Sequence, residues 1–346
     1  MRGPLMAAVA VDVLGEPQWS VGLEDFVSAA AFSPDGLRFA AGSLSGEALV
    51  VDAATGASPI VAPHHSMGVL DLSWSPDGMR LAIAGHDGIV RIMHVDGTEI
   101  AALHLGGWVS ALKWRADGAQ LAVAAGRVLH LLNEDGKQLM SSEPLTSTIT
   151  AIAWAANKRR VVAACYGGVA WFEAEHGPKP VKNFSWKGSI LCVAPSPDGR
   201  WLTVGAQDNT VHIWRLWSAE ELEMNGYPTK VEHLSWHHGS RWMAVGNLGE
   251  ITIWDFAGKG PGGRRPQQID AHTRSVSALE FQPGGDLLAS GSRDGSVAVW
   301  DTSAKVARLA SRRTYGDVVA GLSWAPDGAS LAIALASGTI ECLPVA

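Results

Sequence analysis

The sequence predicts an all-β protein in which a four-stranded antiparallel unit is repeated eight times along 346 residues. Two observations predict it. Alternating apolar residues followed by an aromatic residue and a Ser-Pro-Asp-Gly-like turn recur at intervals of about forty residues, as in LDLSWSPDG up to Gly78 and AGLSWAPDG up to Gly328. In addition, no stretch of about twelve residues has the period of an amphipathic helix. Only Ser218–Met224 is expected to form a single helical turn.

Each repeat is expected to contain its strands in the same order. The alternating phrase is the first strand, and a run of small residues such as Leu81–Gly85 is the second. A second alternating segment such as Gly295–Asp301 is the third, and a less regular fourth strand leads to the next repeat. Asp and Gly between these segments favour tight turns. The whole chain, residues 1–346, is predicted to be one domain, with repeats that start near residues 27, 69, 108, 148, 188, 230, 275 and 318.

One copy resembles a known repeat. The segment AHTRSVSALEFQPGGDLLASGSRDGSVAVWD, which ends at Asp301, resembles a WD repeat, and Trp254-Asp255 and Trp300-Asp301 have the dipeptide for which that family is named. The resemblance covers residues 27–343 and implies a β-propeller. Eight copies imply eight four-stranded blades, with the family's more common seven as the alternative. The resemblance also implies that residues 11–20 form the outermost strand of the last blade and close the ring.

The same resemblance implies a buried polar group. His272, Ser290, Asp294 and Trp300 would form the hydrogen-bonded tetrad that staples one blade of the family's fold. Other copies depart from this pattern, because only Asp87 and Asp208 also occupy the tetrad aspartate position. Most other blades are therefore expected to rely on apolar packing.

The tryptophan content is high, with 15 Trp against 7 Phe and 3 Tyr. The repeat accounts for eleven of them, which begin or end strands and suit the wedge between neighbouring sheets. Four lie outside the repeat pattern and are predicted to be exposed contact anchors: Trp19, Trp108, Trp186 and Trp217.

Composition argues against several classes of function. The net charge of −7 argues against a general nucleic-acid binder, and no apolar run reaches the length of about 18 residues that spans a membrane. The three cysteines are too scattered for a disulfide framework or a zinc site. No metal-binding, phosphate-binding or nucleophile motif is present. We therefore expect a soluble cytoplasmic protein that is not an enzyme and has no cofactor.

Two groups of residues are predicted to contact partners. An acidic insertion at residues 215–230 and a basic one at residues 256–268 suggest a docking patch, unless the two pair with each other; its members are Trp217, Tyr227, Arg264 and Arg265. The loops that precede the first strands suggest a second surface, unless these are scattered solvated residues; its main members are Trp108, Trp186, Arg312 and Arg313, with Lys187, Arg293 and Tyr315 beside them.

These features predict a non-catalytic scaffold or assembly subunit that binds one or more proteins, and neither nucleic acid, membrane nor small-molecule substrate. The alternative is a propeller enzyme, or a ligand- or metal-binding accessory protein, whose site lies in the central channel. The first strands supply few residues for such a site, chiefly Asp71, Lys113, Glu232, His233 and Glu280. Metal handling is suggested only by the pairs His64-His65 and His237-His238.

Overall fold

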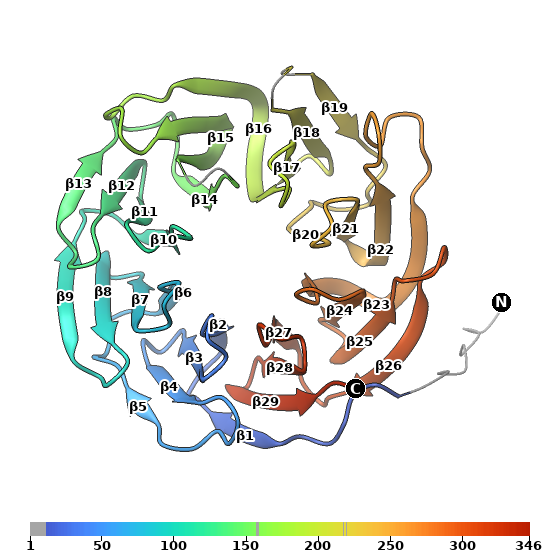
Figure 1. Cartoon of the computed structure of the whole chain (residues 1–346), viewed down its shortest axis with the longest axis horizontal. Helices are drawn as coiled ribbons and strands as arrows, with labels where there is room; N and C mark the ends of the chain where they lie inside the picture. The colour runs from blue at the N-terminus through green and yellow to red at the C-terminus, as the bar shows by residue number, and fades with distance from the viewer. Residues whose placement is uncertain (1–11, 157–158, 217, 219) are drawn as a thin grey trace.

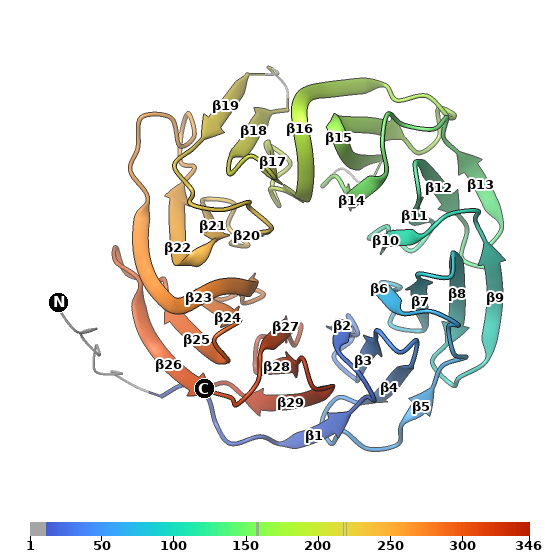
Figure 2. The same cartoon turned by 180° about the vertical axis from the view of Figure 1, so that it is seen from behind.

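Each element assigned in the described part of the chain is a β-strand, as the repeats predict. The computed structural model describes residues 12–156, 159–216, 218 and 220–346. Strands β1 to β29 are arranged in a ring around a central space, and successive sheets are neighbours around it (Figure 1). Seen from behind, the first strand of each sheet again lies innermost (Figure 2).

Four of the sheets contain four strands each. The first is β2 (Val27–Phe32), β3 (Arg38–Ser43), β4 (Ala48–Asp52) and β5 (Ile60–Val61). The second is β6 (Val69–Trp74), β7 (Arg80–Gly85), β8 (Ile89–His94) and β9 (Glu99–His104). The third is β10 (Val109–Trp114), β11 (Leu121–Ala125), β12 (Val128–Leu132) and β13 (Gln138–Ser141). The fourth is β27 (Val319–Trp324), β28 (Ser330–Leu335), β29 (Thr339–Pro344) and β1 (Trp19–Gly22).

A six-stranded and a seven-stranded sheet complete the ring. The six-stranded sheet is β14 (Ile149–Trp154), β15 (Arg160–Glu173), β16 (Lys182–Pro195), β17 (Trp201–Ala206), β18 (Val211–Arg215) and β19 (Glu221–Met224). The seven-stranded sheet is β20 (His233–Trp236), β21 (Trp242–Gly246), β22 (Leu248–Asp255), β23 (Gln267–Phe281), β24 (Leu287–Ser292), β25 (Ser296–Asp301) and β26 (Arg308–Thr314). Because β19 begins at Glu221, the helical turn expected over Ser218–Met224 is wrong where the structure describes it.

The long strands β16 and β23 each pair with different neighbours along their two halves. Residues 182–189 of β16 pair with β15, whereas residues 190–195 pair with β17. Residues 267–275 of β23 pair with β22, whereas residues 276–281 pair with β24. Each of these strands therefore leaves one unit of the ring as its outer strand and starts the next unit as its inner strand. Below, the β14–β16 unit ends at Ser189 and the β23–β26 unit begins at Val276.

The Ser-Pro-Asp-Gly turns form as the sequence predicts. In the turn after β6, Ser75 Oγ donates to Asp77 Oδ1 (2.5 Å) and Asp77 Oδ1 accepts from the Met79 amide (3.0 Å). Gly78 takes a positive φ of 70°, which glycine adopts without a steric penalty. After β20 this position is held by Ser240 (φ 58°).

Glycines in the second strands allow neighbouring sheets to approach closely. A Cβ atom on Gly42 would lie 2.5 Å from Val69 Cγ1, and one on Gly291 would lie 2.5 Å from Val319 Cγ1. Each valine begins the first strand of the next unit, so its side chain fills the space that the glycine leaves. The apolar core consequently lies between consecutive sheets.

Tryptophans at the ends of first strands connect each unit to the one before it. Their indole N–H groups donate to a backbone carbonyl in the preceding first strand. The donors and acceptors are Trp74 and Ala31 (3.1 Å), Trp154 and Lys113 (2.9 Å), Trp236 and Ala194 (3.1 Å), and Trp324 and Glu280 (3.0 Å). Trp114 is the exception in this series, because its buried N–H has no acceptor among the described residues. These tryptophans therefore have an architectural role.

The beginning of the described chain lies beside its end. Strand β1 pairs antiparallel with β29, from Trp19 opposite Cys342 to Gly22 opposite Thr339. Trp19 was predicted to be an exposed anchor, but it is 6% exposed and donates from its indole to the Ala53 carbonyl (2.8 Å) of the first sheet. The closing strand was expected over residues 11–20, whereas the observed strand β1 begins at Trp19 and ends at Gly22. Val11 lies outside the described residues.

Candidate functional site

A cavity at the mouth of the central channel lies where the chain reaches the first strands of consecutive units. Its volume is about 680 Å³. Side chains from β20 and its preceding loop, from the turn before β25 and from β23 and β27 line it. Those that carry its chemistry are Lys230, Glu232, His233, Asn247 and Arg293. We call this the channel-mouth cavity.

Buried hydrogen bonds hold the rim of the channel-mouth cavity in place. Asn247 is 5% exposed, and its amide donates to the carbonyls of Thr229 (2.9 Å) and Lys230 (3.1 Å). The Asn247 side-chain oxygen accepts from Thr229 Oγ1 (2.9 Å), so one side chain satisfies three groups of this loop. On the neighbouring wall, Ser277 Oγ donates to the Val319 carbonyl (2.6 Å). The cavity is therefore built on a preorganised loop and on regular strands.

The charged groups of this cavity are predominantly cationic. Lys230 pairs with Glu232 (2.8 Å), whereas the exposed Arg293 forms no ion pair with any residue that the structure describes. Burial lowers the pKa of His233; Glu232 opposes this shift, and Arg293 and Lys230 add to it. His233 is therefore neutral at neutral pH, and the unpaired positive charge of Arg293 is available to an anionic group of a ligand.

Further along the channel, the predicted charged residues of the first strands line its wall. Asp71 accepts from the Leu112 amide (3.0 Å) and lies 4.0 Å from Lys113 Nζ, beside a cavity of about 260 Å³. Burial raises the pKa of Glu280 to about 7, although the Lys113 charge acts in the opposite direction. These groups come from separate units, and they leave a polar but sparsely charged channel.

On the same face, an apolar patch lies over the first three sheets. Trp108 is 62% exposed, Met67 51% and Leu44 46%. The Trp108 ring packs against His86 at 4.6 Å between centroids, and the His86 amide donates to the carbonyl of Gly68 (2.8 Å). We call Leu44, Met67, His86 and Trp108 the Trp108 patch. Its loops correspond to those that form the channel mouth, so both belong to one face of the ring.

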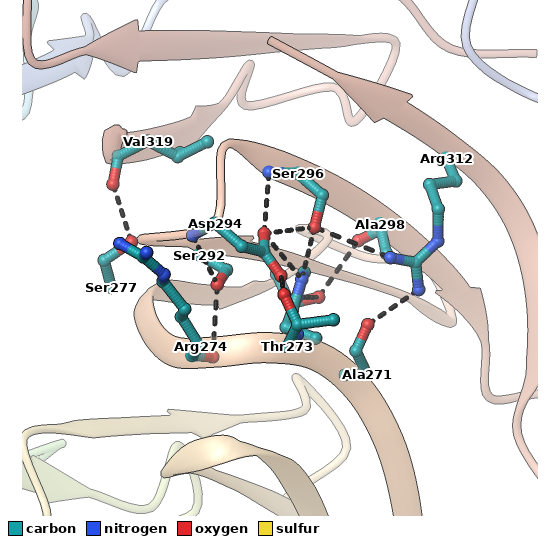
Figure 3. Close-up of polar contacts among 12 residues, drawn as sticks. Ala271, Thr273, Arg274, Ser277, Ser292, Asp294, Ser296, Ala298, Arg312 and Val319 are labelled. Atoms are coloured by element: carbon teal, nitrogen blue, oxygen red, sulfur yellow. Dashed lines mark hydrogen bonds and ion pairs between the residues drawn. The ribbon is translucent and has the colours of Figure 1, made fainter. Parts of the chain in front are cut away.

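The four residues of the expected tetrad lie together in the β23–β26 unit, with one addition. Ser290 Oγ bonds with His272 Nε2 (2.8 Å) and accepts from Trp300 Nε1 (3.0 Å). Ser296 lies between His272 Nδ1 (2.7 Å) and Asp294 Oδ1 (2.6 Å), and the histidine is 3.9 Å from the carboxylate. Figure 3 shows Asp294 beside Ser296 and Thr273. Burial raises the pKa of Asp294, but hydrogen bonds from Ser296 and Thr273 hold it well below its usual range. The sequence comparison missed Ser296.

Two predicted partner anchors occupy the position of His272 in other units. Trp186 Nε1 donates to Asp208 Oδ2 (3.2 Å), and its ring packs on His212 at 3.5 Å between centroids. The Tyr227 hydroxyl accepts from Trp254 Nε1 (3.0 Å), and burial raises its pKa to about 12. Both side chains thus have partners inside their own units. The signal was present in the sequence, because Trp186 and Tyr227 lie four positions before Ile190 and Val231, as His272 lies four positions before Val276.

The two arginines predicted on the loop surface lie instead in the outer strand β26 and are half-buried. Arg312 Nη2 donates to the Ala271 carbonyl (2.7 Å). Arg313 Nη2 donates to the Gly15 carbonyl (2.7 Å) and also lies 3.2 Å from Glu16 Oε1. Arg312 therefore connects β26 to β23, and Arg313 contacts the segment before β1. That Arg312 and Arg313 contact a partner stays a prediction, and the geometry of both side chains favours an architectural role.

The acidic and basic insertions form separate ion pairs within the described residues. Glu220 pairs with Arg215 (3.5 Å), whereas Arg264 pairs with Asp255 (2.9 Å) and also donates to the Ala257 carbonyl (2.7 Å). Arg265 is exposed beside Trp242, in a different hollow from the one that Tyr227 lines. Trp217 lies outside the described residues. The structure thus does not gather Tyr227, Arg264 and Arg265 into one patch.

In the described ranges, no three His, Cys, Asp or Glu side chains converge as metal ligands. His65 bonds through Nδ1 to Asp87 (3.0 Å), and His237 bonds through Nε2 to Asp286 (3.0 Å). One histidine of each pair thus bonds with a neighbouring carboxylate. Within the same ranges, no helix is long and apolar enough to cross a membrane.

Comparison with known proteins connects this geometry to a family. The sequence model of "WD domain, G-beta repeat" matches residues 59–93, 178–215 and 263–301. The chain is 28% identical over 182 residues to Protein HIR1 of Cryptococcus neoformans, which covers 46% of the chain and 20% of that protein. It is 30% identical over 146 residues to eukaryotic translation initiation factor 3 subunit I of Neosartorya fischeri, which covers 38% and 43%. The chain therefore spans less than half of the length of either relative.

Among solved structures, the C-terminal WD40 domain of Sif2 aligns with a TM-score of 0.81 over 97% of this chain and 99% of that one. At 17% identity, this similarity concerns the fold alone. It confirms the predicted all-β propeller built from four-stranded antiparallel sheets.

Proposed function

Because the chain belongs to the WD-repeat β-propeller family, we propose that it is a non-catalytic scaffold that holds an acidic segment of a partner protein at the channel-mouth cavity. The observation that carries this proposal is the unpaired Arg293 beside Lys230 on the rim of a cavity of about 680 Å³. Charge-assisted hydrogen bonds from these two groups suit a carboxylate. The Trp108 patch, on the same face, supplies apolar area for the remainder of the partner.

We further propose that the ring has eight blades and closes by overlap. Dividing β16 and β23 where their pairing partners change, and β15 between Cys165 and Tyr166 in the same way, gives eight four-stranded units, and this supports the count. The pairing of β1 with β29 supports closure. An experimental density map at side-chain resolution counts the blades directly, and any number other than eight would contradict the proposal.

The proposed partners are proteins in the cytoplasm, and neither nucleic acid, membrane nor a small-molecule substrate. The net charge of −7 supports this choice over a general nucleic-acid binder. Relatives named as a subunit of an initiation factor support assembly in a complex. The alternative is a ligand- or substrate-binding site in the channel, which is favoured by the presence of His233 and Ser277 in the same cavity.

Quantitative affinity purification tests the proposed function. The double variant Lys230→Glu/Arg293→Glu reverses both charges of the rim. The control Lys137→Glu/Lys259→Glu makes the same charge change at exposed lysines elsewhere. We expect the wild type and the control to recover the same proteins, and the rim variant to recover at least tenfold less, because two charge-assisted contacts are reversed. Equal recovery by all three would refute the docking site. Turnover or retention of a small molecule that depends on His233 would favour the alternative.

A further inference from the structure

A second cavity lies on the opposite face of the ring, between the β14–β16 unit and the unit formed by β16 to β19. Its volume is about 510 Å³. The turns that follow the first strands β14 and β16 line it, whereas the channel-mouth cavity is lined by loops that precede first strands. Strand direction therefore places the two cavities at opposite ends of the sheets. We call this one the inter-unit groove.

The residue that begins the second strand differs between this junction and the next one. At the next junction, the position that begins the second strand holds Trp201, which is 2% exposed and packs on Phe256 at 5.5 Å between ring centroids. The corresponding position of the β14–β16 unit holds Arg160, which borders the groove. A polar, exposed side chain thus stands where an indole closes the neighbouring junction.

The floor of the groove is aromatic and contains an unsatisfied donor. Trp171 is 4% exposed, lines the groove and lies 5.9 Å from Phe184 between ring centroids. Phe184 lies in turn 5.1 Å from Trp214. The indole N–H of Trp171 is buried without an acceptor among the described residues. A buried donor without a partner carries a free-energy penalty, which a ligand carbonyl would remove.

The rim of the groove is cationic and partly apolar. Lys182 Nζ lies 4.6 Å from the Phe184 ring centroid and forms no ion pair with the residues that the structure describes. Arg160 reaches Glu173 only at 4.0 Å. The carboxylate on the rim, Asp198, accepts from Ser196 Oγ (2.6 Å) and pairs with Arg200 (3.3 Å). Val181, which also lines the groove, is 48% exposed.

We propose that the inter-unit groove binds an extended segment of a second partner protein in which an aromatic or aliphatic residue is followed by acidic residues. The apolar side chain packs on Trp171, Phe184 and Val181. The carboxylates of the segment pair with Lys182 and Arg160. Charge complementarity with this rim selects the acidic partner. The scaffold then holds two partners at once, one on each face.

Three short peptides test the chemistry of this site. The first is acetyl-Gly-Phe-Glu-Glu-Gly-amide; in the second, lysines replace the glutamates, and in the third, serine replaces the phenylalanine. The readout is the ¹H–¹⁵N resonance of the Trp171 indole, assigned by its absence in Trp171→Phe. We expect the first peptide to shift this resonance saturably, and the other two to bind at least tenfold more weakly. No shift, or an equal shift with the lysine peptide, would overturn the proposal.

Variants locate the binding on the protein. Lys182→Glu lies at an exposed position and should weaken binding of the first peptide at least fivefold, whereas the control Lys179→Glu, an exposed residue outside the groove, should leave it unchanged. Arg160→Trp should abolish binding by filling the groove, provided that its melting temperature matches that of the wild type. Wild-type affinity in Lys182→Glu would refute the groove.

A further variant separates this inference from the proposed function. Lys230→Glu/Arg293→Glu should bind the first peptide with wild-type affinity. If that variant loses the peptide, the acidic segment binds at the channel mouth, and the groove proposal fails while the proposed function stands.

Discussion

The β23–β26 unit and the β14–β16 unit have the same strand order but are held together by different chemistry. In the first, Ser290 satisfies His272 and Trp300 inside a buried polar network. In the second, Phe172 is fully buried within an aliphatic cluster at the position that corresponds to Trp300. The comparison teaches that this fold requires a filled junction between sheets. A hydrogen-bonded network is one way to fill it.

The apolar unit should be the more sensitive to loss of volume. Phe172→Ala leaves a cavity in a junction that has only packing to support it, and we expect it to lower the free energy of unfolding by about 3–5 kcal/mol. Ser290→Ala, which removes a hydroxyl from the polar unit, should cost about 1–3 kcal/mol. Urea titrations measure both. The exposed Tyr166→Ala, from the same apolar unit, is the control and should change stability by less than about 0.5 kcal/mol. A larger loss for Ser290→Ala than for Phe172→Ala would reverse the comparison.

The polar unit should make stability depend on pH in a way that the apolar unit does not. Burial lowers the pKa of His272 from 6.5 to about 4. Between those two values the unfolded chain binds a proton that the folded His272 does not, so the free energy of unfolding falls as the pH falls through this window. Above about pH 6.5 the contribution is fully present. From pH 7.5 to 4.5, we expect His272→Gln to lose about 2–3 kcal/mol less stability than the wild type.

The exposed His238→Gln is the control for this pH experiment and should retain the wild-type drop. An identical drop in His272→Gln and the wild type would show that the polar network does not couple to pH.

The smallest expected difference in unfolding free energy is between the replacements of two tryptophans at the ends of first strands, Trp74 and Trp114. Trp74 donates to the Ala31 carbonyl (3.1 Å), whereas the equally buried N–H of Trp114 has no acceptor among the described residues. Replacing each by Phe removes similar volume, but only Trp74→Phe also breaks a hydrogen bond. Trp74→Phe should therefore cost about 1 kcal/mol more than Trp114→Phe in thermal or urea unfolding. An equal loss of unfolding free energy in the two variants would mean that these indoles stabilise the fold by packing alone.

Much of the fold follows from the sequence because the repeat carries it. The alternating first strands and their turns appear where the period of about forty residues places them. The exceptions are local. Trp171 does not take the position of Trp300, because the Ala174 amide bonds with the Arg159 carbonyl as the Thr302 amide bonds with the Asp286 carbonyl. Phe172 therefore corresponds to Trp300, and Trp171 faces the next unit.

The candidate sites were harder to predict because they depend on contacts between distant segments. Arg313 looked like a free surface cation, and only the folded ring brings it to the Gly15 carbonyl. Arg293 was identified as a candidate, whereas the role of Asn247 in holding the adjacent loop has no sequence signature. The inter-unit groove has Arg160 where the next unit has Trp201, a difference that becomes meaningful only when the two junctions are compared in space.

The pairing of β1 with β29 also determines how the molecule responds to mechanical load. Both ends of the described chain leave this antiparallel pair at the same side, next to the bridge between Leu14 and Val345. A force that pulls the two ends apart therefore acts on one hydrogen-bonded pair at a time, from Trp19 opposite Cys342 toward Gly22 opposite Thr339. The ladder peels open in sequence instead of sliding in shear, and the seated Trp19 ring is the first barrier. Tension on the chain ends thus separates β1 from β29 before it disturbs the inner strands that line the two cavities.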